Sequence, residues 1–213
     1  MPKQVDYEAR RRHIAEAVCD LIDRHGPEGA TLRDVAHHAK VSMGAVQRCF
    51  ATKDDMLAFA LHHITERVTA QGQEEIGASA AKESAVTLLA ATLRTLALIE
   101  PHQRRDARIL AAFTAHATAI PSLAEILRQA HAETRDLLAW LIRYGQRSGE
   151  FRADLDADME AEILLPLVEG LTSLALLGHR PTVPAHDMLT RHIDGLLTEP
   201  FRPSQPASST AII

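Results

Sequence analysis

The chain has 213 residues, of which 46% are hydrophobic and 24% are charged, and its formal net charge is −5. This length suits one large domain, or a small domain joined to a larger one. The acidic balance excludes a general nucleic-acid coat, which would be strongly basic. No apolar run reaches the roughly 18 residues of a membrane helix, and the N-terminal segment lacks the apolar stretch of a signal peptide. We therefore expect a cytoplasmic protein with no membrane partner.

Residues suited to metal binding or catalysis form no recognisable pattern. The two cysteines, Cys19 and Cys49, make no CxxC pair. The histidines at 37–38 and 62–63 are adjacent in sequence, so the two rings of each pair point to different faces of a helix and do not chelate. A GxGxxG motif, a P-loop and a nucleophile elbow are also missing. We expect no metal, no cofactor and no enzymatic activity.

Charge is distributed unevenly along the chain. Residues 1–53 carry nine basic and seven acidic side chains, whereas residues 54–213 carry fourteen basic and twenty-one acidic ones. A mildly basic head on an acidic body fits a protein whose first fifty residues contact something anionic.

The first part of the chain predicts four helices. Apolar residues over 14–22 recur at the spacing of one buried helical stripe, and Gly26-Pro27 should end this helix. Thr31 and Ser42 are good N-caps for two short helices. Thr52 should cap a fourth, longer one.

The rest of the chain shows the same helical periodicity and no strand-like alternation. Five further helices are expected to begin near Lys82, at Pro101, at Pro121, after Asp154 and at Pro184. The predicted fold is all-α, with about nine helices. A three-helix head would occupy residues 1–53 and a helical-bundle body residues 54–199. Residues 200–213 contain three prolines and three serines and should form a loose tail.

The segment from Thr31 to Phe50, TLRDVAHHAKVSMGAVQRCF, carries the functional signal. Two short helices joined by a three- or four-residue turn have the spacing of a helix-turn-helix, whose second helix enters the major groove of DNA. The front of that helix, residues 42–45, is made mostly of small side chains, which allow its backbone to approach the bases. Gly44 costs about 1 kcal/mol of helix stability relative to Ala, and close approach is one reason to tolerate it.

Residues 11–57 resemble the DNA-binding head of the tetracycline-repressor (TetR) family. The resemblance rests on an arginine-led first helix and on motif residues at matching spacings. These are Gly26, Thr31, Asp34-Val35-Ala36, Val41-Ser42-x-Gly44, Phe50 and Lys53. Residues 148–171, SGEFRADLDADMEAEILLPLVEGL, resemble the usual approach to the family's penultimate helix.

The resemblance implies a set of DNA contacts in the head. Thr31, Ser42 and Lys53 would bind phosphates, an anchoring role that helix N-termini share. Met43, Ala45, Gln47 and Arg33 would face base edges, Gly44 would allow close approach, and Arg48 could do either. Thr31 and Ser42 also serve as plain helix caps, and the arginines could be solvated charges.

Two positions depart from the family pattern. Lys40 stands where the family usually has Gly, at a position that often needs a positive φ. Gln47 stands where the family usually has Tyr, which typically anchors a phosphate. Gln can bind a phosphate, or it can pair with adenine through two hydrogen bonds, so both roles stay open.

For the body, the resemblance implies a ligand pocket between the middle helices. The candidates combine aromatic walls with polar handles: Phe113, His116, Trp140, Tyr144 and Glu169. The aromatic residues could instead belong to the core and Glu169 to the surface. Pro166 should kink or interrupt its helix, either lining the pocket or making a simple bend.

The last two helices carry wide apolar faces, which in the family form a two-fold dimer interface. The candidates are Leu164, Leu167, Leu171, Leu174, Leu189, Ile193 and Leu196. Such a dimer spaces two reading helices about 34–36 Å apart, which is one turn of DNA, and requires a near-palindromic site.

These features together predict a ligand-responsive transcriptional regulator. We expect a homodimeric repressor that binds double-stranded operator DNA and is released by a small-molecule effector. One alternative is a helical-bundle carrier of a hydrophobic small molecule with weak or vestigial DNA binding. Another is a DNA-binding dimer that answers to a partner protein, which a well-filled body would favour.

Overall fold

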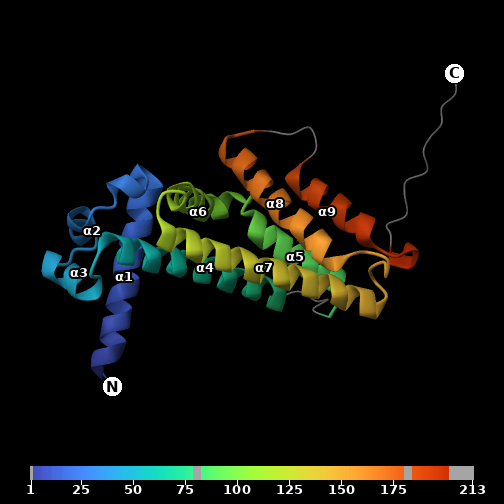
Figure 1. Ribbon diagram of the computed structural model, residues 1–213, viewed down its shortest axis with the longest axis horizontal. Helices are drawn as coiled ribbons and strands as arrows, with labels where there is room; N and C mark the ends of the chain where they lie inside the picture. Colours follow the sequence, from blue (N-terminus) through green and yellow to red (C-terminus); the bar gives the residue numbers. More distant parts are fainter. Residues whose placement is uncertain (1, 79–82, 180–183, 202–213) are drawn as a thin grey trace.

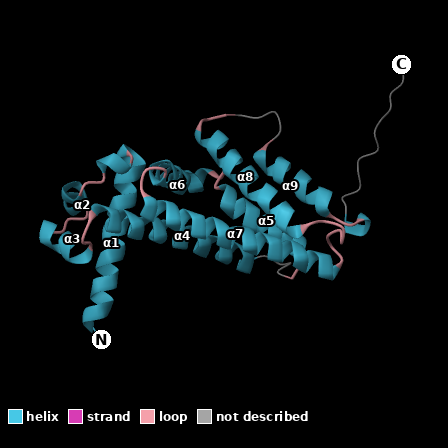
Figure 2. Cartoon of the chain, viewed as in Figure 1, coloured by secondary structure: helices cyan, strands magenta, loops and turns pink. Residues whose placement is uncertain are grey.

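The computed structural model describes residues 2–78, 83–179 and 184–201, and these residues form nine α-helices and three short 3-10 turns (Figures 1 and 2). The α-helices are α1 (Pro2–His25), α2 (Leu32–His38), α3 (Met43–Cys49), α4 (Lys53–Ala78), α5 (Ala85–Ala97), α6 (Arg104–Ala117), α7 (Pro121–Ser148), α8 (Ala157–Leu176) and α9 (Ala185–Leu196). The 3-10 turns are Pro27–Gly29, Pro101–Gln103 and Glu199–Phe201. The described residues contain no strand, which confirms the all-α prediction.

Most helix ends lie where the sequence signals place them. Gly26 and Gly149 adopt positive φ values of 71° and 78° after α1 and α7, as residues that follow a helix end often do. The Asp156 carboxylate accepts the backbone N–H groups of Asp158 and Met159 and thereby caps α8. None of the described helices is long and apolar enough to cross a membrane.

Three details differ from the sequence-based expectations or lie beyond the structure. Pro101 opens a 3-10 turn, and α6 begins only at Arg104. Helix α8 continues through Pro166, whose ring is exposed. Most of the expected tail, residues 202–213, lies outside the described residues.

Buried side chains form two main cores along the long axis of the molecule. The first joins α1, α2, α3 and α4 to α6 and the start of α7, so it continues past residue 53 into the body. The second joins α5, the end of α7, α8 and α9. Figure 1 shows the short helices of the head at one end and α8 and α9 on the body. Helices α4, α6 and α7 connect the two regions.

Candidate DNA interface and ligand cavity

The helix-turn-helix begins with two N-caps made by side chains. The Thr31 hydroxyl accepts the Asp34 backbone N–H at 3.2 Å and itself donates to the Asp34 carboxylate. The Ser42 hydroxyl accepts the Ala45 N–H at 3.1 Å. Both caps satisfy backbone donors that the first helical turn cannot pair. The capping roles predicted for Thr31 and Ser42 are therefore confirmed, and both side chains are exposed.

The turn between α2 and α3 places Lys40 in the left-handed region, with φ of 54°. The Val41 N–H donates to the Ala36 carbonyl at 3.0 Å, and the Lys40 N–H donates to His37 at 3.2 Å. This pattern is a Schellman ending, which favours Gly at the position of Lys40 because other residues carry a Cβ. The position thus has the backbone conformation that the family's usual Gly suits, and Lys40 adopts it.

Helix α3 presents an exposed face and a buried one. Gln47 and Arg48 are exposed, and Met43 is 40% exposed. Ala45 is only 8% exposed, because it faces the head's interior beside Val46, so its side chain offers little surface to a base. A Cβ added at Gly44 would meet only the end of the Arg48 side chain, at 3.6 Å. Packing within the chain therefore does not require glycine at position 44.

The remaining candidate DNA residues flank α3. Arg33 is exposed on α2, and Lys53 is half-buried as the first residue of α4. The Thr52 hydroxyl accepts the Asp55 N–H at 3.0 Å, and the Asp55 carboxylate accepts the Ala51 N–H at 3.1 Å. This reciprocal cap fixes Lys53 at a helix N-terminus, where the helix dipole favours anions.

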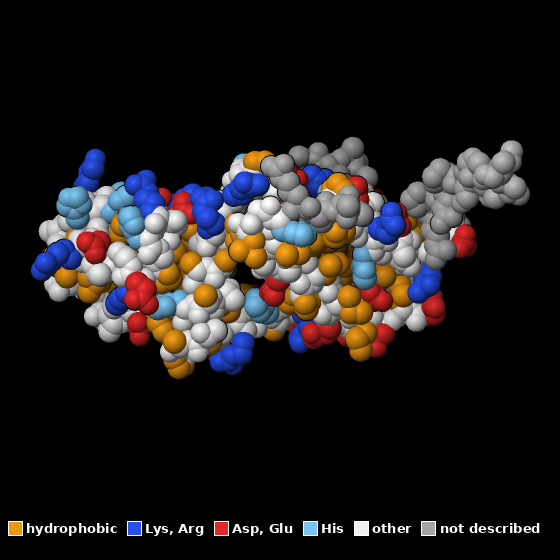
Figure 3. All heavy atoms as spheres, turned by 90° about the horizontal axis from the view of Figure 1, so that it is seen from above, with side chains coloured by type: hydrophobic (Ala, Val, Ile, Leu, Met, Phe, Trp, Pro, Cys, Tyr) orange, Lys and Arg blue, Asp and Glu red, His pale blue; other side chains and the backbone are white. Residues whose placement is uncertain are grey.

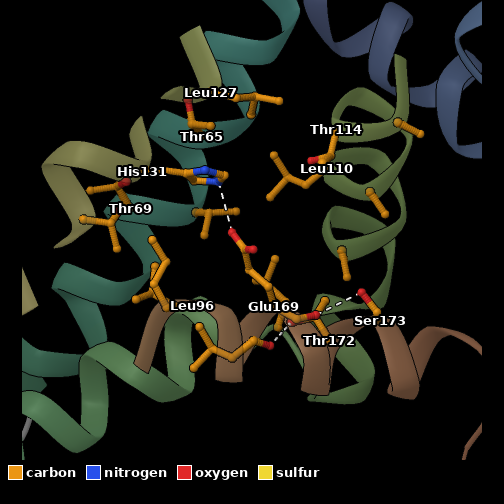
Figure 4. Close-up of a pocket in the computed structure, with 18 residues that line it drawn as sticks. Thr65, Thr69, Leu96, Leu110, Thr114, Leu127, His131, Glu169, Thr172 and Ser173 are labelled. Atoms are coloured by element: carbon orange, nitrogen blue, oxygen red, sulfur yellow. Dashed lines mark hydrogen bonds and ion pairs between the residues drawn. The ribbon is translucent and has the colours of Figure 1, made fainter. Parts of the chain in front are cut away.

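A cavity of about 450 Å³ lies between the two cores and opens to solvent (Figure 4). Its apolar wall includes Val68, Leu98 and Ala107, which form a small buried cluster of their own. Its polar groups include several hydroxyls and an ion pair of 3.0 Å between His131 of α7 and Glu169 of α8. The volume falls within the usual range for small-molecule sites.

Of the five predicted pocket residues, only Glu169 lines this cavity. Phe113 is fully buried in the core shared with the head, and His116 lies outside the cavity lining. Trp140 is 50% exposed and stacks on Tyr144, with ring centroids 5.6 Å apart. The prediction differs from the structure because it ranked residues by aromatic character, whereas the register of each helix decides which side chains face the cavity.

Most of the predicted dimer residues are buried within the monomer. Leu164, Leu171, Leu189, Ile193 and Leu196 belong to the second core and are at most 6% exposed. Leu167 is half-buried, and Leu174 is 42% exposed. The apolar stripes of α8 and α9 thus pack first against helices of their own chain. A different stripe of α8 remains exposed, and sequence periodicity alone did not separate the two.

Comparison with known proteins matches both parts of the chain. Residues 14–59 match the family described as "Bacterial regulatory proteins, tetR family", and residues 85–198 match "BetI-type transcriptional repressor, C-terminal". The regulator PksA of Bacillus subtilis is 32% identical over 210 residues, covering 96% of this chain and 98% of PksA. The chain belongs to the TetR family. It is therefore a transcriptional regulator with a DNA-binding head, in a family that is not an enzyme class.

Solved structures of other transcriptional regulators share the fold. One from Rhodococcus sp. Rha1 has a TM-score of 0.73 at 31% identity, and the match covers 87% of this chain and 95% of the other. One from Saccharomonospora viridis, solved in complex with choline, has a TM-score of 0.73 at 28% identity. That match covers 88% of this chain and 94% of the other.

In this TetR-family chain an ion-pair network joins the head to the body. Helix α1 presents three carboxylates at i, i+4 and i+7: Glu16, Asp20 and Asp23. Arg105 of α6 donates to Asp20 at 2.7 Å, and Arg67 of α4 donates to Glu16 at 2.5 Å. The sequence pattern did not reveal this network. The acidic stripe on the first helix was its available signal, but the arginine partners lie more than fifty positions away in the sequence.

The network lowers the pKa of Glu16 and the pKa of Asp20. Burial alone would raise the pKa of Glu16, but the hydrogen bond with His63 and the charge of Arg67 outweigh burial and hold that pKa below its ordinary value. Burial likewise opposes the hydrogen bonds of His38 and Arg105 to Asp20, and the pKa of Asp20 is again lowered. Both carboxylates therefore remain charged at neutral pH.

Aromatic packing holds α1 against the base of α3. The Arg11 guanidinium lies 4.1 Å from the ring centroid of Phe59 and 5.0 Å from that of Phe50, which is cation–π geometry. His13 Nε2 lies 2.8 Å from the carbonyl oxygen of Ala39, in the turn between α2 and α3. These contacts join α1 to the helix-turn-helix of this TetR-family chain.

Proposed function

We propose that the protein is a repressor that binds a near-palindromic operator as a homodimer and releases it when a small molecule occupies the cavity. The observation that carries this proposal is the double role of α6. One face of α6 lines the cavity with Leu110 and Thr114. Another face presents Arg105 and Arg108 to the carboxylates of α1.

This arrangement gives a route from effector to DNA. A ligand that displaces α6 would strain or re-pair the contacts between α6 and α1, and α1 packs against the helix-turn-helix. The effector must prefer one arrangement of α6, because equal affinity for both would shift nothing. The choline complex of the Saccharomonospora relative supports a small molecule as effector.

For the dimer, we propose the exposed stripe of α8 in place of the buried leucines. Its members lie within one narrow arc of the helix: Met159, Ile163, Pro166, Gly170, Leu174 and Leu177. Figure 3, which looks onto the α8 and α9 side, shows hydrophobic side chains exposed over the body. An apolar stripe of this kind favours burial against a second copy.

Selection of bound fragments from random DNA, followed by anisotropy titration at two salt concentrations, tests the proposal. We expect a near-palindromic site bound at about 10⁻⁸ M or tighter, and compounds that release it can then be screened. Weak binding without sequence enrichment would contradict the proposal and favour the carrier of a hydrophobic molecule. The cavity argues against the partner-protein alternative, which a filled body would have favoured.

A further inference from the structure

The cavity wall is made of aliphatic and hydroxyl side chains. Its lining, among the described residues, includes no Phe, Tyr or Trp. Quaternary ammonium ligands, which carry no N–H donor, are typically held by the faces of aromatic rings. A cage of that kind is not available in this part of the structure.

Four of the hydroxyl groups around the cavity donate hydrogen bonds to backbone carbonyls of their own helices. Thr65 donates to His62 at 2.8 Å, and Thr134 donates to Ala130 at 2.8 Å. Thr172 and Ser173 likewise donate to the carbonyls of Val168 and Glu169, each at 2.9 Å. A hydroxyl has one proton and two lone pairs. These side chains therefore offer a ligand mainly acceptor lone pairs.

The carboxylate of Glu169 adds the strongest acceptor. Figure 4 shows its side chain reaching across the cavity toward His131, with which it pairs at 3.0 Å. An ionised carboxylate accepts hydrogen bonds at several positions and donates none, so its pairing with one ring nitrogen leaves acceptor capacity unused. The polar part of the wall is thus rich in acceptors.

We propose that the effector is an apolar molecule whose polar head donates hydrogen bonds to Glu169, with a primary or secondary ammonium group as the preferred head. The apolar part would lie against Leu96, Leu110 and Leu127. Charge-assisted N–H···O⁻ bonds are about twice as strong as neutral ones. A quaternary ammonium lacks the donor, and a carboxylate ligand would be repelled by Glu169. This inference rests on the proposed role of the cavity as the effector site.

Three probes with one decyl chain and different heads test the inference: decylamine, decyltrimethylammonium and decanoate. Isothermal titration of the full chain should show decylamine binding at least tenfold more tightly than the other two. Glu169→Gln should remove this preference while the protein still unfolds cooperatively. Glu162→Gln is the matched control, because Glu162 lies on the same helix outside the cavity lining. It should leave the preference intact.

Other outcomes would overturn the inference. Tighter binding of decanoate would assign recognition of the ligand's polar group to His131. Equal binding of all three probes would show that the cavity does not distinguish the ligand's polar group. If no probe binds but the operator is bound specifically, the ligand class is wrong while the regulator stands. Failure to bind any operator would contradict the proposed function itself, whatever the probes do.

Discussion

Arg108 of α6 grips Asp23 of α1 with two nitrogens: Nε donates to one carboxylate oxygen at 2.6 Å and Nη2 to the other at 3.1 Å. This paired geometry fixes direction as well as distance. Arg105, three residues earlier on α6, donates to Asp20 on the same face of α1. These two ion pairs therefore fix α6, which forms part of the cavity wall, against α1, which packs on the head.

Arg108→Ala should weaken the response to effector more than it weakens the fold. The pair is partly exposed, so its loss should cost less than about 1 kcal/mol of unfolding free energy. We expect the factor by which an effector reduces operator affinity to shrink several-fold, as measured by anisotropy with and without effector. Arg128→Ala is the control, because Arg128 pairs with Glu125 of its own helix, α7, at 2.6 Å. An undiminished response in Arg108→Ala would remove this pair from the route.

Gly44→Ala should separate stability from DNA binding. The added Cβ has room within the chain, and Ala is favoured over Gly in a helix by up to about 1 kcal/mol. Urea unfolding should therefore show unchanged or higher stability. Operator affinity should fall, because the methyl group stands where α3 is proposed to approach the bases. Unchanged affinity would show that the backbone at Gly44 does not approach the DNA closely.

Gln47→Ala distinguishes base reading from phosphate binding. If Gln47 pairs with adenine, affinity for the operator should fall by roughly 1–3 kcal/mol and specificity should relax at one base pair. If Gln47 instead binds a phosphate, the substitution should weaken the affinity for all DNA sequences about equally. Titrations against the operator and its single-base variants make the comparison, with Gln129→Ala, at an exposed position of α7, as the control.

Charging the exposed stripe of α8 should split the dimer without unfolding the chain. Leu174→Glu places a carboxylate on a side chain that is already 42% exposed, so the monomer should remain folded. Leu171 lies three residues earlier on α8 and is buried in the second core. Leu171→Glu therefore buries an unpaired charge and should unfold the protein. Sedimentation and thermal unfolding separate the two outcomes. A dimer that survives Leu174→Glu would place the interface elsewhere.

Acid should weaken the ion pairs that join the head to the body. The folded pKa values of Glu16 and Asp20 are lowered, so their contribution to stability is complete above their ordinary pKa values of about 4. That contribution is lost as pH falls further, through the lowered folded pKa values. Glu16→Gln should accordingly show a flatter decline of stability below about pH 4.5 than the unchanged chain. An identical decline would show that Glu16 does not contribute.

The local signals in the sequence were sufficient for the helices and for the DNA-binding head. N-caps at Thr31 and Ser42 and the helix end at Gly26 depend on neighbours within a few residues. The helix-turn-helix is itself a local motif with fixed spacing, so its exposed residues could be chosen from the pattern. Ala45 is the exception, because its side chain lies on the buried face of α3 and is only 8% exposed. Residues half a helical turn apart lie on opposite faces of a helix, and the motif alone does not say which face is buried.

The cavity, the exposed stripe of α8 and the head-to-body network required the tertiary structure. An apolar stripe on α8 has the same sequence signature whether it faces α5 and α7 or a second chain, and only the packing assigned Leu171 to the core and Leu174 to the surface. His131 and Glu169 meet across 38 positions in sequence, and Arg108 meets Asp23 across 85. Helical periodicity fixes which residues share a face, but the rotation of each helix against its neighbours fixes what that face meets.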